Sequence, residues 1–349
     1  MREIVKQVAA IDVDQKLLVT TLGRMYDDWS PELYAQKTFA NTQKGFEVFL
    51  AWVKKNTIAE VAVRFVMEAT GVYHESLAYF LDDHTEEVTI VLPNKISNYM
   101  RTLETKTITD KTASEAIARF ALERKLELWK RPKNIYKKLR QLTRERDQLV
   151  TERTMVKNQL HAEQAEAEPN KSSITRIRAR IKMLDKQEQE IKAELTALIS
   201  TDVEMKKIVV LLCSLSGVRL LTAATVLGET NGFELIRNRR QLASYAGFDV
   251  KEKQSGTSVK AKPKISKKGN KYLRKAMHLP ALSAIRHDER FKAVFVRMVS
   301  KHGIKMKAAV AVQRKLLEMM FTLYKTNKKY DKEYLIQKIV QSEEILLLK

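Results

Sequence analysis

Three carboxylates of the sequence stand where predicted strands end or a helix begins. Asp12 follows an apolar, β-rich run and lies at the turn of the predicted first hairpin, and Glu68 closes the β-rich run at 61–67. Asp110 lies just ahead of a predicted helix that includes Ala116–Leu122. Mg²⁺ and Mn²⁺ prefer oxygen ligands and leave coordination positions open for phosphate oxygens. Cations that are held by converging acids of this kind can cleave and join phosphodiesters. The three acids therefore predict a divalent-cation site.

Each acid also has an ordinary interpretation. Asp12 is followed by Asp14, and the two could serve in a turn. Asp110 follows Thr109 and could be a helix N-cap. Glu68 is harder to explain without a partner, because a carboxylate that ends a buried strand is costly to desolvate. From the residues alone, metal binding and these structural roles stay open.

The elements around the acids predict an α/β layer with a mixed sheet over residues 1–131. Segments rich in β-forming residues come first, and strands and helices then alternate, which is the pattern of such a layer. The predicted strands are Lys6–Ile11, Lys16–Leu22, Gln36–Phe39, Val61–Met67 and Val88–Leu92, and the predicted helices are Gly45–Lys55 and Glu75–Leu81.

Residues 132–204 predict a long helical coiled-coil arm. The sequence has no glycine between Gly71 and Gly217, so we expect two helices joined near Glu168–Ser173. Apolar residues in the second helix keep a 3-4 spacing that only Glu188 interrupts. This narrow seam requires a partner helix, either Ile135–Leu160 of the same chain or another copy. We expect self-association as a homodimer or homotetramer. The seam residues are Ile174, Ile177, Ile181, Leu184, Ile191, Leu195 and Leu198.

Residues 205–349 predict a mostly helical domain, and the charge of the chain is concentrated after residue 100. Residues 1–100 carry 10 Lys and Arg against 14 Asp and Glu, whereas the remainder carries 54 against 28. A surplus on this scale indicates a polyanionic partner, most simply nucleic acid. Loops are expected at Gly217, Gly228–Gly232, Gly247 and Gly256, with an apolar core helix at 307–325.

The segment Lys251–Lys275 is the most basic part of the chain, with 10 basic residues and one acid. Its apolar residues suggest an ordered loop that leads into a helix at Lys271, and lysines there can neutralise phosphates. We expect Gly269 to permit close backbone approach. Leu215–Leu227 resembles a helix-hairpin-helix turn, whose backbone amides can contact phosphates. The predicted nucleic-acid contacts are Lys260, Lys264, Lys267, Lys268 and Arg274.

Other site chemistries find little support in the composition. The single cysteine, Cys213, lies among apolar residues and is expected to fill the core. The six histidines form no metal-spaced cluster, which argues against a zinc site. With no signal peptide and no membrane-length apolar run, we expect a soluble, cytoplasmic protein.

Several motifs resemble one family across nearly the whole chain. ID at 11–12, MEATGVY at 67–73 and TDKTASEAIARFA at 109–121 resemble the RuvC-like domain of DEDD-type insertion-sequence transposases. This family includes the Piv/MooV DNA invertases and the bridge-RNA-guided recombinases. SLSGVRLLTAATVLGE at 214–229, RQLASYAGF at 240–248 and SGTSVKAKPKISKKGNKYLRKAM at 255–277 resemble its C-terminal transposase domain.

The resemblance implies a ribonuclease-H-like fold for residues 1–131, with Asp12, Glu68 and Asp110 as the ligands of Mg²⁺ or Mn²⁺. It also implies that Ser255 is the nucleophile, which holds DNA as a phosphoserine ester, although from sequence alone Ser255 looks like loop material. A structured guide RNA would then read the DNA sequence, while the protein recognises helical shape and backbone.

The chain departs from the family pattern at residue 113. The family pattern has a fourth acid three residues after Asp110, and this chain has Ala113 there. Glu115 lies five residues from Asp110, about 140° round a helix, and is a poor substitute. We therefore expect weak metal binding and little strand transfer. The alanine is either natural to this chain or was introduced into it. Ala261, where the family usually has glycine, should have only a modest backbone effect.

Three functions are consistent with these observations. The leading one is a DNA recombinase of a mobile element that works through Ser255 and the metal-bound acids. The second is a junction-cutting nuclease that uses metal-activated water and makes no use of the serine. The third is a nucleic-acid-binding protein without catalytic activity, which stays an alternative because Ala113 weakens the metal site.

Overall fold

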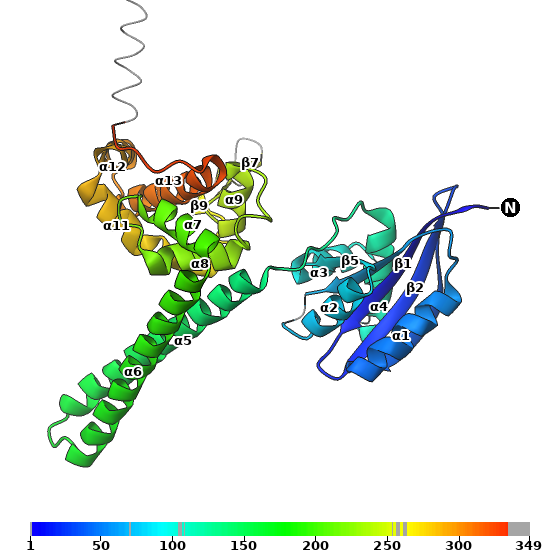
Figure 1. Ribbon diagram of the computed structural model, residues 1–349, viewed down its shortest axis with the longest axis horizontal. Helices are drawn as coiled ribbons and strands as arrows, with labels where there is room; N and C mark the ends of the chain where they lie inside the picture. Colours follow the sequence, from blue (N-terminus) through cyan, green and yellow to red (C-terminus); the bar gives the residue numbers. More distant parts are fainter. Residues whose placement is uncertain are drawn as a thin grey trace, which may run out of the picture. The chain divides into compact units, whose positions relative to one another are not determined.

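The computed structural model of the chain has two compact units, Met1–Arg131 and Pro132–Lys349, and Figure 1 shows their helices and strands. The structure describes residues 2–69, 71–103, 107, 109–252, 254–255, 259–260 and 264–333, with only the backbone at 254–255 and 259–260. Ala261 lies outside the described residues, so the effect expected there stays a prediction.

The first unit is built on a mixed five-stranded sheet with strand order β3-β2-β1-β4-β5. The first three strands are antiparallel neighbours, and β4 and β5 run parallel to β1. This arrangement confirms the predicted ribonuclease-H-like α/β layer. The strands are β1 (Ile4–Val13), β2 (Leu17–Tyr26), β3 (Pro31–Ala40), β4 (Val63–Glu68) and β5 (Glu87–Val91).

Alternation along the strands divides the core of this unit between the two faces of the sheet. Ala9 and Ile11 of β1 face one cluster, whereas Val8 and Ala10 face the other, as the period of two requires. Helices α1 (Gln43–Asn56) and α2 (Glu75–Asp83) cover the first face. Helices α3 (Pro93–Met100) and α4 (Asp110–Glu123) cover the second face.

The arm consists of α5 (Asn134–Gln164) and α6 (Lys171–Thr201), which pack against each other in one chain. Asn170 caps α6, and the connection falls where the sequence predicted it. Ile177 and Leu184 of the seam are buried with Val156 of α5. The seam thus has its partner within the same chain, so the self-association that we expected cannot be argued from it.

Glu188, which interrupts the apolar seam, lies in the interface as a buried charge. It is 3% exposed. Arg146 of α5 bonds its carboxylate at 2.8 Å and Lys192 at 3.0 Å, and Arg153 also pairs with it. These basic partners lower its pKa to about 2, against the opposing effect of burial. The ion pairs with Arg146 and Arg153 therefore join α6 to α5 at this position of the seam.

Removing this charge should loosen the arm. We expect Glu188→Gln to lower the free energy of unfolding by about 2 kcal/mol, because the arginines lose charge-assisted hydrogen bonds in a buried position. The matched control is Glu190→Gln, whose side chain is 61% exposed and should change stability by less than about 0.5 kcal/mol. Urea unfolding of both variants measures the difference, and equal losses would contradict a role for Glu188 in joining the two helices.

The helices that follow the arm share one core with its base. Tyr136 and Leu139 of α5 and Leu195 and Ile199 of α6 lie in the same buried cluster as the later helices. Arm and helical bundle therefore form one compact unit. The helices are α7 (Val203–Cys213), α8 (Leu220–Thr230), α9 (Arg239–Ala246), α10 (Lys271–Ala276), α11 (His278–His287), α12 (Glu289–His302) and α13 (Lys305–Thr326).

Gly228 lies inside α8, so the loop expected at 228–232 begins only after Thr230. The apolar run at 307–325 forms most of α13, a core helix as predicted. Among the described residues, no helix is long and apolar enough to cross a membrane.

Candidate active site

Two of the predicted metal ligands stand next to each other at the ends of adjacent parallel strands. Asp12 is the penultimate residue of β1, and Glu68 is the last residue of β4. The register pairs Ile11 with Met67, which places the two acids one residue further on in neighbouring strands. By alternation both carboxylates belong to the face that α3 and α4 cover. Asp12 thus lies within β1 and not in the hairpin turn where we expected it, because β1 extends through Val13.

Asp110 reaches this face as the first residue of α4. Its neighbour Thr109 is the N-cap and forms a capping box with Thr112. The alternative role of Asp110 as the N-cap is therefore wrong. One turn on, the buried hydroxyl of Ser114 lies 2.8 Å from that of Thr21 in β2. This polar contact anchors the first turn of α4 against the sheet.

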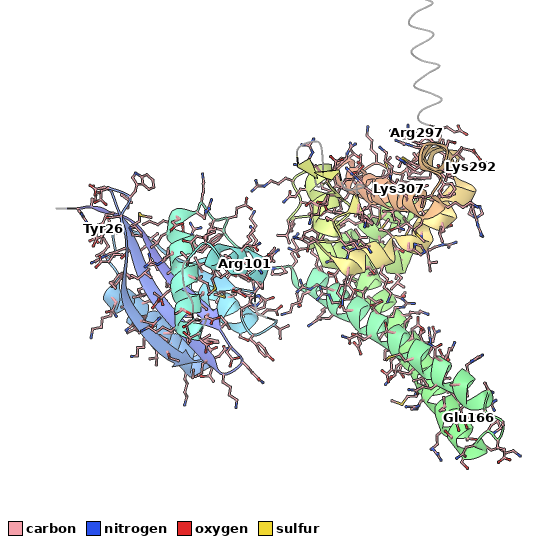
Figure 2. The ribbon with its side chains drawn as sticks, turned by 180° about the vertical axis from the view of Figure 1, so that it is seen from behind. Tyr26, Arg101, Glu166, Lys292, Arg297 and Lys307 are labelled. Atoms are coloured by element: carbon pink, nitrogen blue, oxygen red, sulfur yellow. The ribbon has the colours of Figure 1, made fainter. Side chains whose placement is uncertain are left out.

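A cavity of about 730 Å³ opens over the strand ends. Asp12 and Glu68 line it, and Ala113 lines it too. Residue 113 therefore faces the same space as the two acids, as the i, i+3 relation to Asp110 predicts. The methyl group of alanine offers no ligand atom there. The opposite wall is formed by α3 and the residues after it, including Asn94, Ser97 and Arg101, and Figure 2 labels Arg101.

Helix α3, and with it this wall, was not predicted from the sequence. The segment is only eight residues long, too short to show a clear helical period, and it begins at a proline in the first helical position. That proline, directly after an apolar strand, was the available signal.

The acids repel one another. Burial raises the pKa of Asp12 to about 6, and the charges of Asp110 and Glu68 add to the effect. Burial also raises the pKa of Glu68. Carboxylates whose ionised forms are disfavoured in this way are held ready for a cation, which would remove both the repulsion and the cost of desolvation.

The set of donors fits a hard divalent cation in chemical type but is incomplete. Within the part of the chain that the structure describes, no three His, Cys, Asp or Glu side chains come close enough to hold a metal ion. Asp12 and Glu68 supply carboxylate oxygens from fixed strand ends, and Asp110 acts on Asp12 through its charge. Ala113, which lines the same cavity, adds no donor atom to this set.

The raised pKa of Asp12 predicts that its charge destabilises the fold. The pKa of Asp12 is about 6 in the folded chain and 3.8 in the free side chain. The protonated form therefore contributes folding stability that is fully present below pH 3.8. It is lost as the pH rises to about 6. In chelator at pH 7, Asp12→Asn should therefore raise the free energy of unfolding by about 2 kcal/mol. The gain should vanish near pH 4.

Denaturant unfolding of Asp12→Asn at both pH values measures this effect. The control is Asp14→Asn, an exposed neighbour that caps the turn through the Lys16 amide and should change stability little at either pH. A pH-independent gain in Asp12→Asn would show that repulsion is not its cause.

The backbone of Ser255 lies near the end of a nested hairpin in the second unit. Strand β6 (Val250–Lys251) pairs with β9 (Lys264–Ile265), and inside them β7 (Gln254–Ser255) pairs with β8 (Val259–Lys260). In this inner pair Ser255 is opposite Val259. The side chains of Ser255 and Lys260 lie outside the described residues, and their predicted roles stay predictions.

The base of this hairpin is tied to buried groups of the helical unit. Glu229 of α8, 3% exposed, accepts two hydrogen bonds from Arg144, at 2.7 and 2.9 Å, and a third from Asn270 at 2.6 Å. The Asn270 backbone amide bonds the Tyr245 carbonyl, and the Ser266 hydroxyl bonds the Asp249 carboxylate at 2.5 Å. This network holds both ends of the segment that carries Ser255, and no sequence pattern pointed to it.

The predicted phosphate contacts differ in what they do within the protein. Lys264, Lys267 and Lys268 are exposed and form no ion pair with any described carboxylate. Arg274 instead donates to the carbonyls of Ala246, at 2.7 Å, and Gly269, at 3.2 Å. Its guanidinium thus holds two chain segments together, and a role on DNA stays a prediction.

Two glycines are explained by internal packing. A Cβ on Gly269 would lie 2.5 Å from the Tyr245 carbonyl oxygen. A Cβ on Gly217, whose φ is +87°, would lie 2.3 Å from the Pro280 carbonyl oxygen. The close approach that we expected at Gly269 is therefore to the protein's own backbone. At Gly217, the predicted hairpin turn packs against α11.

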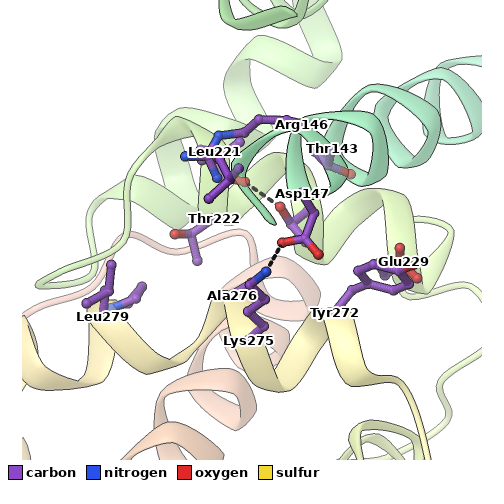
Figure 3. A pocket seen from close by; sticks show the side chains of 13 residues that line it. Thr143, Arg146, Asp147, Leu221, Thr222, Glu229, Tyr272, Lys275, Ala276 and Leu279 are labelled. Carbon is purple, nitrogen blue, oxygen red and sulfur yellow. Dashed lines mark hydrogen bonds and ion pairs between the residues drawn. The ribbon is translucent and has the colours of Figure 1, made fainter. Parts of the chain in front are cut away.

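A second pocket, of about 290 Å³, lies in the helical unit among α5, α8, α10 and α11. Figure 3 shows the ion pair between Lys275 and Asp147 in this pocket. Glu229 is bonded to Arg144 and Asn270. These paired groups are not available to bind a ligand. Lys275, one of the ten basic residues at 251–275, is neutralised in this pocket.

Two family models match the chain. One, described as Transposase, matches residues 26–164, and the other, described as Transposase IS116/IS110/IS902 family, matches residues 209–295. The chain belongs to the DEDD-type insertion-sequence transposase family. The first match includes two of the three predicted metal ligands and Ala113, and the second includes the Ser255 hairpin. The transposase is thereby placed among enzymes that recombine DNA.

The transposase has relatives of similar length. It is 28% identical over 300 residues to the pilin gene-inverting protein of Moraxella bovis, which covers 84% of this chain and 90% of that protein. The pilin gene-inverting protein of Moraxella lacunata is 29% identical over 303 residues, with the same coverage. Among solved structures, T. thermophilus RuvC in complex with a Holliday junction substrate is similar at 9% identity and a TM-score of 0.27. That match covers 35% of the transposase and 99% of RuvC.

Proposed function

We propose that the chain is the recombinase of a mobile element, which cuts and rejoins DNA through a phosphoserine intermediate formed on Ser255. The observation that carries the proposal is the convergence of Asp12, Glu68 and residue 113 on one cavity. The inversion of a gene by the Moraxella relatives supports a reaction in which strands are rejoined and not only cut.

Each part of the proposed site has a definite task. Asp12, Glu68 and Asp110 would hold Mg²⁺ or Mn²⁺ at the mouth of the cavity, with the helix α4 and the strand ends fixing their positions. When bound, the cation supplies Lewis-acid polarisation of the scissile phosphate. Asn94, Ser97 and Arg101 would bind and orient phosphate oxygens from the opposite wall.

The chemical step keeps the number of phosphate esters constant. The Ser255 hydroxyl loses its proton, its oxygen forms a bond to phosphorus, and the bond from phosphorus to the departing strand breaks. The departing deoxyribose oxygen takes up a proton. Attack by a hydroxyl of the second strand then reverses these steps and releases the serine. No water is consumed, so both strands end intact.

The remaining parts of the proposal concern partners. The exposed lysines at 264, 267 and 268 would neutralise phosphates, and a structured guide RNA would supply sequence recognition. We also propose a homodimer or homotetramer in which Asp12 of one copy works with Ser255 of another. Mixed complexes of Asp12 and Ser255 variants test this arrangement: complementation supports it, and its complete absence contradicts it.

The function itself is tested by the nucleic acid that the protein carries and by the product that it makes. Purified chain should co-purify with a discrete structured RNA, detectable by sequencing. With that RNA and duplex DNA, the Ala113→Asp chain should form a covalent protein–DNA adduct that resists denaturation. A reaction that yields only hydrolysed ends and no adduct favours the second candidate, a nuclease that uses water, because the acids alone suffice for hydrolysis.

A further inference from the structure

The hairpin of α12 and α13 presents a strongly basic, partly apolar tip that the active site does not use. Between residues 290 and 317 the sequence has no Asp or Glu, whereas it has eight Lys and Arg. The hairpin packs on the helical unit through Phe291 and the inner face of α13. Figure 2 labels Lys292, Arg297 and Lys307 among its side chains.

The turn at the tip exposes large apolar side chains. Gly303 ends α12 with φ +69°, and a Cβ on it would meet nothing within 4 Å. Ile304 is 56% exposed and Met306 is 61% exposed. Neither packs in a described hydrophobic cluster. These two side chains, two residues apart in the chain, give the tip a small apolar surface that is open to a partner.

Positive charge surrounds these apolar side chains. Lys301, Lys305 and Lys307 are exposed, and none forms an ion pair with a described carboxylate. Local desolvation, with the charges of Lys307 and Lys301, lowers the pKa of His302 between them. The first turn of α13 also lacks a side-chain cap, so its amide N–H groups add donors at the tip.

We infer that this tip is a DNA contact, in which Ile304 and Met306 press against a base step in the minor groove while the three lysines bind the flanking phosphates. Apolar wedges flanked by cations are the means by which proteins unstack and bend duplex DNA. An acidic protein surface would satisfy the lysines but gives no reason for the apolar side chains to project between them. The inference rests on the proposed action on DNA and is independent of Ser255 and the acidic cluster.

The charge of the tip is tested first, with the full chain and a 30-base-pair duplex of mixed sequence. We expect Lys301→Gln/Lys305→Gln/Lys307→Gln to reduce the slope of log affinity against log salt by about 2 to 3. The control, Lys44→Gln/Lys54→Gln/Lys55→Gln in α1, removes equal charge from the first unit and should change it less. Equal slopes for the two triple variants would overturn the inference.

The wedge is tested by fluorescence of 2-aminopurine at a central TpA step. Binding of the parent chain should raise the fluorescence, and Ile304→Ala/Met306→Ala should abolish the rise and weaken binding by about tenfold or more. The control, Met183→Ala on the arm, removes a side chain that is 59% exposed and should change neither. Circular dichroism melting confirms that all variants fold.

Two further outcomes separate this inference from the proposed function. If the parent chain binds the duplex but the wedge variants bind and unstack it equally well, the tip inference alone fails. If duplex RNA of the same sequence competes better than DNA, and does so through the same lysines, the assignment to DNA is overturned. If the parent chain binds no duplex, the tip inference fails, whereas the recombinase proposal is decided separately by the adduct assay.

Discussion

Replacing Ala113 with aspartate should raise the rate of DNA strand cleavage by at least about a hundredfold. Ala113 lines the cavity with Asp12 and Glu68, so the new carboxylate enters the space between the strand ends and α4. A properly held divalent cation contributes several kcal/mol to stabilising the transition state, and each 1.36 kcal/mol is worth about tenfold in rate. Cleavage of end-labelled DNA with Mg²⁺, with and without the RNA that co-purifies, measures the gain.

The same variant should bind the cation more tightly, which thermal unfolding can follow without any catalysis. The added charge increases repulsion in the metal-free chain, so Ala113→Asp should melt below the parent in chelator and above it in Mg²⁺. The matched control is Ala113→Asn, which has nearly the same shape but no charge and should gain little in either assay. If Ala113→Asp shows no gain in cleavage and no added Mg²⁺ dependence of melting, residue 113 is not a ligand position.

The sequence predicted the first unit well because its signals are local. The runs that predicted β1, β2 and β4 are nearly continuous in apolar residues because both faces of the sheet are buried. The order of the strands was not predicted, because it depends on pairing in the folded sheet. The placement of Asp12 was less accurate because strand ends depend on pairing: β1 continues to Val13 by pairing with Leu18. Helix α3 was missed because eight residues carry too little periodicity.

The second unit shows where local patterns stop being informative. The seam of α6 required a partner helix but could not specify which one, and α5 of the same chain provides it. Glu188 looked like a break in the seam, yet Arg146 and Arg153, about 40 residues earlier in the chain, turn it into a buried ion cluster. Pairings between residues so far apart depend on the folded topology. The same holds for Glu229, which fixes the base of the Ser255 hairpin from α8.

Ser255 is much harder to predict from the sequence than the three acids. The carboxylates can be argued from strand ends, burial and mutual repulsion, whereas a serine beside glycine has no such signature. What the structure adds is a held position: the backbone of Ser255 lies in a two-stranded ladder whose base is tied to Glu229 and Asp249. A nucleophile needs such fixed placement, because misplacement by about 1 Å can cost about a hundredfold in rate.

Replacing Ser255 with alanine in the Ala113→Asp background should therefore abolish the covalent protein–DNA adduct and lower strand exchange by about a thousandfold or more. Loss of a nucleophile removes the covalent route entirely, and the remaining groups supply only binding and electrostatic stabilisation. Adduct formation is measured by denaturing gel with labelled DNA, and strand exchange by amplification across the new junction.

Ser258→Ala in the same background is the matched control, since it removes a hydroxyl from the same short segment. It should leave adduct formation and strand exchange near the level of the Ala113→Asp chain. The two readings of Ser255→Ala also distinguish the rival mechanisms. If hydrolytic cutting continues at the parent rate while no adduct is seen in either protein, water is the nucleophile and the acids work alone. If the adduct persists in Ser255→Ala and disappears in Ser258→Ala, the covalent mechanism stands and its nucleophile is Ser258.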